Sequence, residues 1–126
     1  MGARHLIDTY VSIDFSANRI PKSGIELITD CLNDDPQISI ITKIELLGFS
    51  FVTSAIKEFV KSSNVIGLGD DIVEKTILIR KQCKIKLPDA IIAATAIISG
   101  LILLSRNTVD FKNIKGLNHL DLFQIS

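Results

Sequence analysis

The stretch that decides the fold is KLPDAIIAATAIISGLILLSRNTVDF, residues Lys86 to Phe111. Within it, Ala90 to Leu104 carry no charged side chain, and Ile, Leu and Ala predominate. This run is shorter than the roughly 20 apolar residues of a membrane-spanning helix and is interrupted by Gly100, so it predicts protein interior and no membrane segment. Asp89 stands directly before the run, and a carboxylate in that place requires an explanation.

Pro88 and Gly100 divide this stretch into a predicted helix and a predicted strand. Pro88 suits the first turn of a helix and Gly100 suits its C-cap, which predicts a helix from Leu87 or Asp89 to Ser99. The apolar residues Leu101 to Leu104 then predict a short buried strand.

The same alternation of strand and helix runs through the rest of the chain. We predict strands at His5 to Ile7, Ile38 to Ile41 and Val65 to Leu68, with a last strand at Leu120 to Ile125 after a turn at Asn107 to Phe111. The predicted helices are Gly24 to Leu32, Thr42 through Leu47, Val52 to Lys61, and Ile72 to Cys83 with Asp70 as N-cap. Such alternation predicts an α/β fold in which a parallel sheet is sandwiched between helices.

Length and composition indicate one globular domain covering residues 1–126. The 126 residues include 47% apolar residues and equal numbers, 14 each, of basic and acidic residues. This size is enough to bury about two-thirds of the surface of the unfolded chain. The N-terminus lacks the pattern of a secretory signal, so we expect a cytoplasmic protein.

Four acidic residues lie where predicted strands give way to helices. Asp8 follows the first strand, and Glu45 lies just past the second. Asp89 heads the apolar helix, and Asp110 lies past the fourth strand. Because ligands of parallel α/β sheets bind beyond the carboxyl ends of the strands, we predict that these side chains converge at one edge. When carboxylates lie close together, their repulsion raises the pKa of at least one of them unless cations neutralise the charge. We therefore predict Mg²⁺ or Mn²⁺ as cofactor.

Such a cluster fits the hydrolysis of a phosphodiester. A carboxylate-held pair of divalent ions, about 4 Å apart, lowers the pKa of a bound water and stabilises the departing oxygen. We therefore predict a metal-dependent nuclease whose catalytic residues are also its metal ligands: Asp8, Glu45, Asp89 and Asp110. On this account the apolar helix fixes the position of Asp89, since its alanines permit close packing.

Most of these acids also have a structural explanation. Glu45 can complete a capping box with Thr42. Asp89 and Asp110 can cap helix N-termini or favour the helix dipole. Asp8 is harder to explain in this way, because an unpaired carboxylate after a buried strand is costly.

The other residues that could bind a metal are weaker candidates. Asp14 is near enough to Asp8 in sequence to be an accessory ligand. His5 and His119 have no ligand-like partners at nearby spacing, which argues against zinc. Cys31 and Cys83 lack a CxxC spacing and are predicted to be reduced, buried or half-buried thiols.

Four motifs resemble, in order and spacing, those of a known family: LIDT (Leu6 to Thr9), TKIELLG (Thr42 to Gly48), KLPDAIIAATA (Lys86 to Ala96) and SRNTVDF (Ser105 to Phe111). From about residue 5 to residue 117 the chain resembles the PIN-domain ribonucleases, especially the VapC-like toxins of bacterial toxin-antitoxin pairs. The resemblance implies a three-layer αβα sandwich around a parallel sheet and Mg²⁺- or Mn²⁺-dependent endonucleolytic cleavage of RNA. It also implies a homodimer and inhibition by a cognate antitoxin protein.

Carried over by position, the family's acids coincide with those chosen above, and its polar supports are Thr9, Ser105 and Asn107. One residue departs from the family pattern, because Tyr10 stands where Asn is usual after the Asp-Thr pair. The bulkier Tyr10 either points aside, leaving activity intact, or narrows the site and weakens the support of Asp8.

The net charge of the residues outside the four site acids is compatible with an anionic substrate. The 14 basic residues then face 10 acidic ones, a surplus of four. Four basic residues adjoin the motifs and are candidates for contacts with RNA phosphates: Lys43, Lys86, Arg106 and Lys112. The alternative for each is a solvated surface position.

Two other functions remain open at this level. One is a catalytically impaired PIN-like protein that only binds its partner, which Tyr10 keeps possible. The other is a phosphoacceptor receiver domain, which has a similar length and order of elements. Receiver domains have an acidic pair after the first strand, whereas Asp8 has no acidic neighbour.

Overall fold

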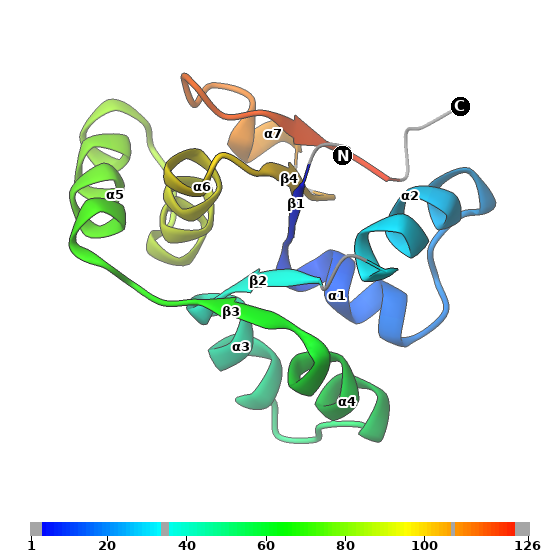
Figure 1. Ribbon diagram of the computed structural model, residues 1–126. Coiled ribbons are helices and arrows are strands. Elements are labelled where there is room, and N and C mark those ends of the chain that lie inside the picture. The colour runs from blue at the N-terminus through cyan, green and yellow to red at the C-terminus, as the bar shows by residue number, and fades with distance from the viewer. Residues whose placement is uncertain (1–3, 34–35, 107, 123–126) are drawn as a thin grey trace.

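A single parallel sheet organises the molecule. The computed structural model describes residues 4–33, 36–106 and 108–122 (Figure 1). The strands are β1 (His5–Ile7), β2 (Gln37–Ser39), β3 (Asn64–Ile66), β4 (Ile102–Leu104) and β5 (His119–Leu120). Every pairing is parallel, and the spatial order is β3-β2-β1-β4-β5. This arrangement confirms the predicted α/β class.

Helices connect the strands and cover both faces of the sheet. They are α1 (Thr9–Ser16), α2 (Lys22–Asn33), α3 (Ile40–Leu47), α4 (Ser54–Ser62), α5 (Asp70–Gln82), α6 (Leu87–Ser99) and α7 (Thr108–Phe111). Figure 1 shows α5 and α6 on one side of β1 and β4, with α1 and α2 on the other. Within the described residues, none of these helices combines the length and apolarity that crossing a bilayer requires.

Strand alternation divides the interior into two cores. Leu6 and Leu103 belong to the core beneath α5 and α6. Their chain neighbours Ile7 and Leu104 belong to the core shared with α1, α2 and α4. All four side chains are fully buried, and such burial stabilises the fold by about 1.5–3 kcal/mol for each side chain. The three-layer αβα sandwich is therefore confirmed.

The apolar helix α6 has the bounds predicted from Pro88 and Gly100. It runs from Leu87 to Ser99 and ends at Gly100, which adopts the left-handed conformation at φ 68°. Residues Ala90 to Ala96 are all buried, and the small alanines let α6 pack closely on the sheet and on α5. Asp89, the third residue of α6, is thereby held at a fixed place at the edge of the sheet.

Helix α1 was not predicted, and it begins directly after β1. It buries Thr9, Val11, Ser12 and Asp14, so polar and apolar residues share its inward faces. The usual separation of an apolar stripe from a polar one is therefore weak. This mixture conceals the helix from a search for apolar periodicity.

The predicted start of α3 is wrong. The strand predicted to reach Ile41 ends at Ser39, whose hydroxyl caps α3 by accepting a hydrogen bond from the Ile41 N–H at 3.1 Å. Thr42 is thus inside the helix, and no capping box with Glu45 opens it.

Three smaller corrections concern other boundaries. Gly69, not Asp70, is the N-cap of α5. Part of the predicted turn at 107–111 is the short helix α7. The last strand begins at His119 and ends at Leu120, and residues 123–125 of its predicted extent lie outside the described residues, as does the side chain of Cys31.

Candidate active site

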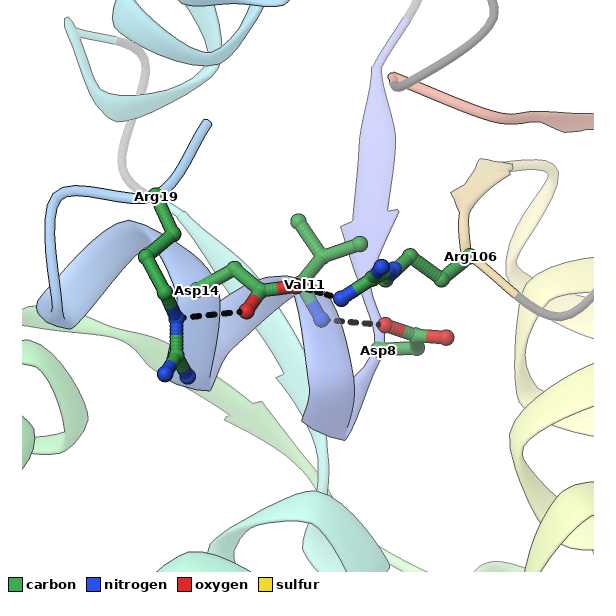
Figure 2. A network of polar contacts seen from close by, with 5 residues as sticks. All are labelled: Asp8, Val11, Asp14, Arg19 and Arg106. Carbon is green, nitrogen blue, oxygen red and sulfur yellow. Dashed lines mark hydrogen bonds and ion pairs between the residues drawn. The ribbon is translucent and has the colours of Figure 1, made fainter. Parts of the chain in front are cut away.

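Asp8 occupies the junction between β1 and α1, at the carboxyl edge of the sheet. Its backbone N–H donates to the Leu104 carbonyl at 3.1 Å, which extends the pairing of β1 with β4. Its side chain is the N-cap of α1, where Oδ1 accepts from the Val11 N–H at 2.8 Å (Figure 2). Asp8 therefore has a capping role of its own. The N-cap of α6 is Lys86, without a side-chain bond, while Asp89 and Asp110 lie in the first turns of α6 and α7, where a negative charge favours the helix dipole as the structural explanation expected.

The Asp8 carboxyl is buried in an unfavourable electrostatic setting. Burial, at 3% exposure, raises its pKa to about 6, and the negative charges of Asp89 and Asp14 push the pKa in the same direction. The Val11 N–H and a hydrogen bond from the buried Ser105 hydroxyl oppose the rise without cancelling it. Among the described residues Asp8 forms no ion pair with a basic side chain.

Asp89 links the remaining acids. Burial is the largest cause of its raised pKa, and the charges of Asp110 and Glu45 add to it. Lys86, the residue that caps the same helix, opposes the rise. Since Asp89 also raises the pKa of Asp8, the other three predicted acids lie within electrostatic reach of this one carboxylate.

Glu45 is oriented by a pair of threonine hydroxyls. The Thr9 hydroxyl lies 2.7 Å from Glu45 Oε1 and 3.2 Å from Thr42 Oγ1. Because Thr9 has a single hydroxyl proton, its short bond to the carboxylate leaves Thr42 to donate in the hydroxyl pair. These contacts connect the first turn of α1 to α3, and they explain Thr42 better than the capping box does.

The donor set of this edge suits a hard divalent cation. The side chains near this edge are carboxylates, and burial together with the neighbouring negative charges raises the pKa values of Asp8 and Asp89, which a divalent cation would lower. Within the described part of the chain, no three His, Cys, Asp or Glu side chains are already grouped closely enough to hold an ion. Ligation of an ion would therefore involve adjustment of these side chains.

The predicted supporting and phosphate-binding residues differ in how far they are buried. Ser105 is buried beside Asp8, while Asn107 lies outside the described residues. Lys86 and Lys112 are exposed and Lys43 is half-buried. Tyr10, on the first turn of α1, is 63% exposed.

Asp14 takes a role different from the predicted accessory ligand. Although buried, it is paired with two arginines: Arg19 Nε lies 3.1 Å from Oδ1, and Arg106 Nη1 lies 3.0 Å from Oδ2 (Figure 2). The spacing of five residues between Asp14 and Arg19 is not the three or four of a helical ion pair, and Arg19 lies beyond the end of α1. The sequence therefore contains no clear signal for this contact. The contact with Arg106 spans 92 positions and depends on the fold.

Comparisons with known proteins agree on the family. The family model described as the PIN domain matches residues 6–117. A chain of the toxin-antitoxin complex from Klebsiella pneumoniae is 30% identical, with 96% of this chain and 99% of that chain covered and a TM-score of 0.68. None of the curated protein sequences compared with the chain gives a significant match.

Two further solved structures share the fold. A chain of the DNA-bound VapBC from Salmonella typhimurium gives a TM-score of 0.80 at 22% identity, covering 96% of this chain and 99% of that one. VapBC-1 from nontypeable Haemophilus influenzae gives 0.76 at 24% identity, covering 95% and 98%. The family assignment leaves no support for the receiver-domain alternative. The chain belongs to the PIN domain family, as a VapC-like member whose fold matches that of chains in toxin-antitoxin complexes.

Proposed function

We propose that this protein is a Mg²⁺- or Mn²⁺-dependent endoribonuclease that acts in the cytoplasm as the toxin of a toxin-antitoxin pair. The family assignment supports a hydrolase of nucleic acid phosphodiesters in general terms. The choice of RNA as substrate and the choice of metal are parts of the proposal. Asp8, Glu45, Asp89 and Asp110 are its proposed metal ligands and catalytic residues.

The observation that carries the proposal is the setting of two carboxylates, one buried and one half-buried, at one edge of the sheet: beyond the effect of burial, Asp110 and Glu45 raise the pKa of Asp89, and Asp89 raises that of Asp8. The capping bond to the Val11 N–H offsets only part of the cost of holding Asp8 buried with a raised pKa and with Asp89 nearby. The arrangement lowers the stability of the folded state, and such groups recur where proteins bind ions or perform chemistry. Divalent cations supply the charge that the site lacks.

The metal and the residues around it have separate roles in the proposed reaction. When bound, the metal supplies an activated water and charge stabilisation for the departing oxygen. Asp8 and Asp89 are fixed by the α1 N-cap and by α6, and Thr9 orients Glu45. Anchoring the backbone of these residues limits the adjustment to their side chains when an ion binds.

Basic residues outside the cluster are proposed to hold the RNA backbone. Lys86 already acts on Asp89, so it lies close enough to place a substrate phosphate near the acids. Lys43 and Lys112 are proposed to extend this contact along the strand. Contacts of this kind bind phosphates without reading the base sequence.

The proposed protein partners are a cognate antitoxin and a second copy of the chain. The solved structures that share the fold include complexes of toxin with antitoxin. Large apolar side chains are exposed on α3 and in the loop after it, among them Ile44, Leu47, Phe49 and Phe51. Apolar groups gathered on a surface favour burial against another protein.

Cleavage of single-stranded RNA by the purified protein tests the proposal. We expect cleavage with Mg²⁺ or Mn²⁺, loss of cleavage in EDTA, and loss of cleavage in Asp89→Asn. Glu74→Gln, which removes an exposed acid from α5, is the matched control and keeps wild-type activity. Equal activity of wild type and Asp89→Asn, or cleavage that survives EDTA, would refute the proposed chemistry.

A catalytically impaired binding protein is the second candidate, and it rests only on the departure of Tyr10 from the family pattern. Its exposure of 63% supports the version in which the ring points aside and activity is intact. Tyr10→Asn, which restores the residue usual in the family, separates the two. An inactive wild type that gains metal-dependent cleavage on this substitution would identify Tyr10 as the cause of impairment.

A further inference from the structure

An ion-pair tie joins α1 to the segment that follows β4. Arg106 Nη1 donates to Asp14 Oδ2 at 3.0 Å, across 92 positions of sequence. The preceding residue, Ser105, hydrogen-bonds the Asp8 carboxyl through its side chain. The segment is therefore attached to α1 at two points, one at each end of the helix, and Figure 2 shows Arg106 reaching across Val11 toward Asp14.

This attachment affects two of the four site acids. Asp8 begins α1, whereas Asp110 lies in α7, a few residues beyond Arg106. Asp110 raises the pKa of Asp89, and Asp89 raises that of Asp8, so the placement of Asp8 and Asp110 on either side of Asp89 determines the shape of the cluster. A tie between α1 and the start of the α7 segment restrains that placement.

We propose that Asp14 is a positioning residue, which acts through Arg106 to hold Ser105 against Asp8 and to hold the Asp110 segment in register with α1. The inference rests on the proposed nuclease function and deepens it. Its physical basis is burial: the Asp14 carboxylate is only 4% exposed, so it is a rigid anchor for a guanidinium. A charge-assisted bond of this kind is short and directional.

Arg19 provides a matched internal control. Its Nε lies 3.1 Å from the other oxygen of the same carboxylate, and its side chain is 59% exposed against 52% for Arg106. Removing either guanidinium leaves Asp14 with one partner and similar solvent access. Arg19 follows α1 in sequence and lies on the far side of Asp14 from Arg106, so only the loss of Arg106 detaches the site segment.

The test compares Arg106→Gln with Arg19→Gln in single-stranded RNA cleavage with Mn²⁺. We expect kcat to fall about ten- to a hundredfold in Arg106→Gln, as expected for a site displaced by a fraction of an ångström, with KM little changed. Arg19→Gln is expected to keep kcat within about twofold, since it leaves the site segment attached. Arg106→Lys, which keeps one charged donor, is expected to recover part of the loss.

A double substitution tests whether Asp14 and Arg106 act as one unit. Asp14→Asn alone is expected to reproduce the kcat loss of Arg106→Gln. Adding Arg106→Gln to Asp14→Asn is then expected to cost little more, because the two substitutions break the same tie.

Amide hydrogen exchange gives a readout that does not depend on activity. The Ser105 N–H, which donates to the Leu120 carbonyl at 3.0 Å, and the amides of α7 are expected to exchange several-fold faster in Arg106→Gln than in Arg19→Gln. Equal exchange and equal kcat in the two variants would overturn the inference. A rise in KM with unchanged kcat would also overturn it, since Arg106 would then be a phosphate contact. An inactive wild type would refute the proposed function while the exchange comparison still decides the inference.

Discussion

The two buried carboxylates of helix α1 show opposite solutions to the same physical problem. Asp14 is neutralised by Arg19 and Arg106, at 3.1 and 3.0 Å. Asp8 is equally buried, yet its neighbours include the acids Asp89 and Asp14, and its pKa rises to about 6. A paired carboxylate stabilises the fold around it, whereas the hydrogen bonds that Asp8 accepts offset only part of the cost of burying its charge. We propose that this difference marks the functional edge of the sheet, at the junction between β1 and α1.

Activity provides the largest expected contrast between the two carboxylates. Asp8→Asn keeps a side chain that can cap α1, since Asn and Asp are equally good N-caps, but it removes the charge proposed to hold the metal. We expect kcat/KM for RNA cleavage to fall by about a thousandfold, as when a preorganised electrostatic group is removed from an active site. Cleavage by Asp8→Asn at a rate near that of wild type would remove Asp8 from the proposed machinery.

Substitution of Asp14 is expected to lower stability, whereas substitution of Asp8 is expected mainly to lower activity. Asp14→Asn loses charge-assisted bonds to two arginines, which is expected to lower the free energy of unfolding by about 2–3 kcal/mol. Denaturation by urea, followed by circular dichroism in EDTA, measures the change. Arg19→Gln, which breaks one of the two pairs, is the control and is expected to lose roughly half as much. A stability equal to wild type would mean that the Asp14 pairs contribute nothing net.

Asp8→Asn is expected to stabilise the metal-free protein at neutral pH. A raised pKa means that the folded state binds the Asp8 proton more tightly than the unfolded state does. The penalty is therefore absent below the ordinary pKa of 3.8, grows as the pH rises, and is complete above about 6. We expect a gain of about 3 kcal/mol for the variant at pH 7, because the pKa rises from 3.8 to about 6, and a gain well below about 1 kcal/mol near pH 4. Urea denaturation at both values checks this, and a pH-independent difference would contradict the assigned cause.

The orienting contact of Glu45 is expected to have the smallest effect of these changes. Thr9→Val removes the hydroxyl that bonds Glu45 Oε1 at 2.7 Å while keeping the shape of the side chain. Loss of such a supporting bond typically weakens metal affinity or activity by about 10- to 100-fold, and we expect the lower end because Glu45 itself remains. Cleavage assays at several Mn²⁺ concentrations measure it. Thr53→Val, at the remote N-cap of α4, controls for the loss of a hydroxyl.

Sequence reasoning recovered the sheet and the apolar helix because their signals are local. Pro88 and Gly100 bracket α6 closely, and short apolar runs mark the strands. The convergence of Asp8, Asp89 and Asp110 also follows from the sequence, since parallel strands present their carboxyl ends at one edge.

Other features depended on contacts that no local pattern encodes. Helix α1 buries Ser12 and Asp14, residues that a periodicity search treats as exposed. Thr42 resembles a helix cap in sequence, but in the fold its hydroxyl faces Thr9. The pairing of Asp14 with Arg106 exists only because β1 and β4 are neighbours in the sheet.

Titration of the metal-free protein with Mn²⁺ in a calorimeter tests the central claim most directly: that the acids at this edge are kept together to hold divalent cations. The account predicts saturable binding by the wild type, proton release on binding near pH 6, and loss of binding in Asp89→Asn but not in Glu74→Gln. Absence of binding by the wild type, or the same affinity in Asp89→Asn, would contradict it.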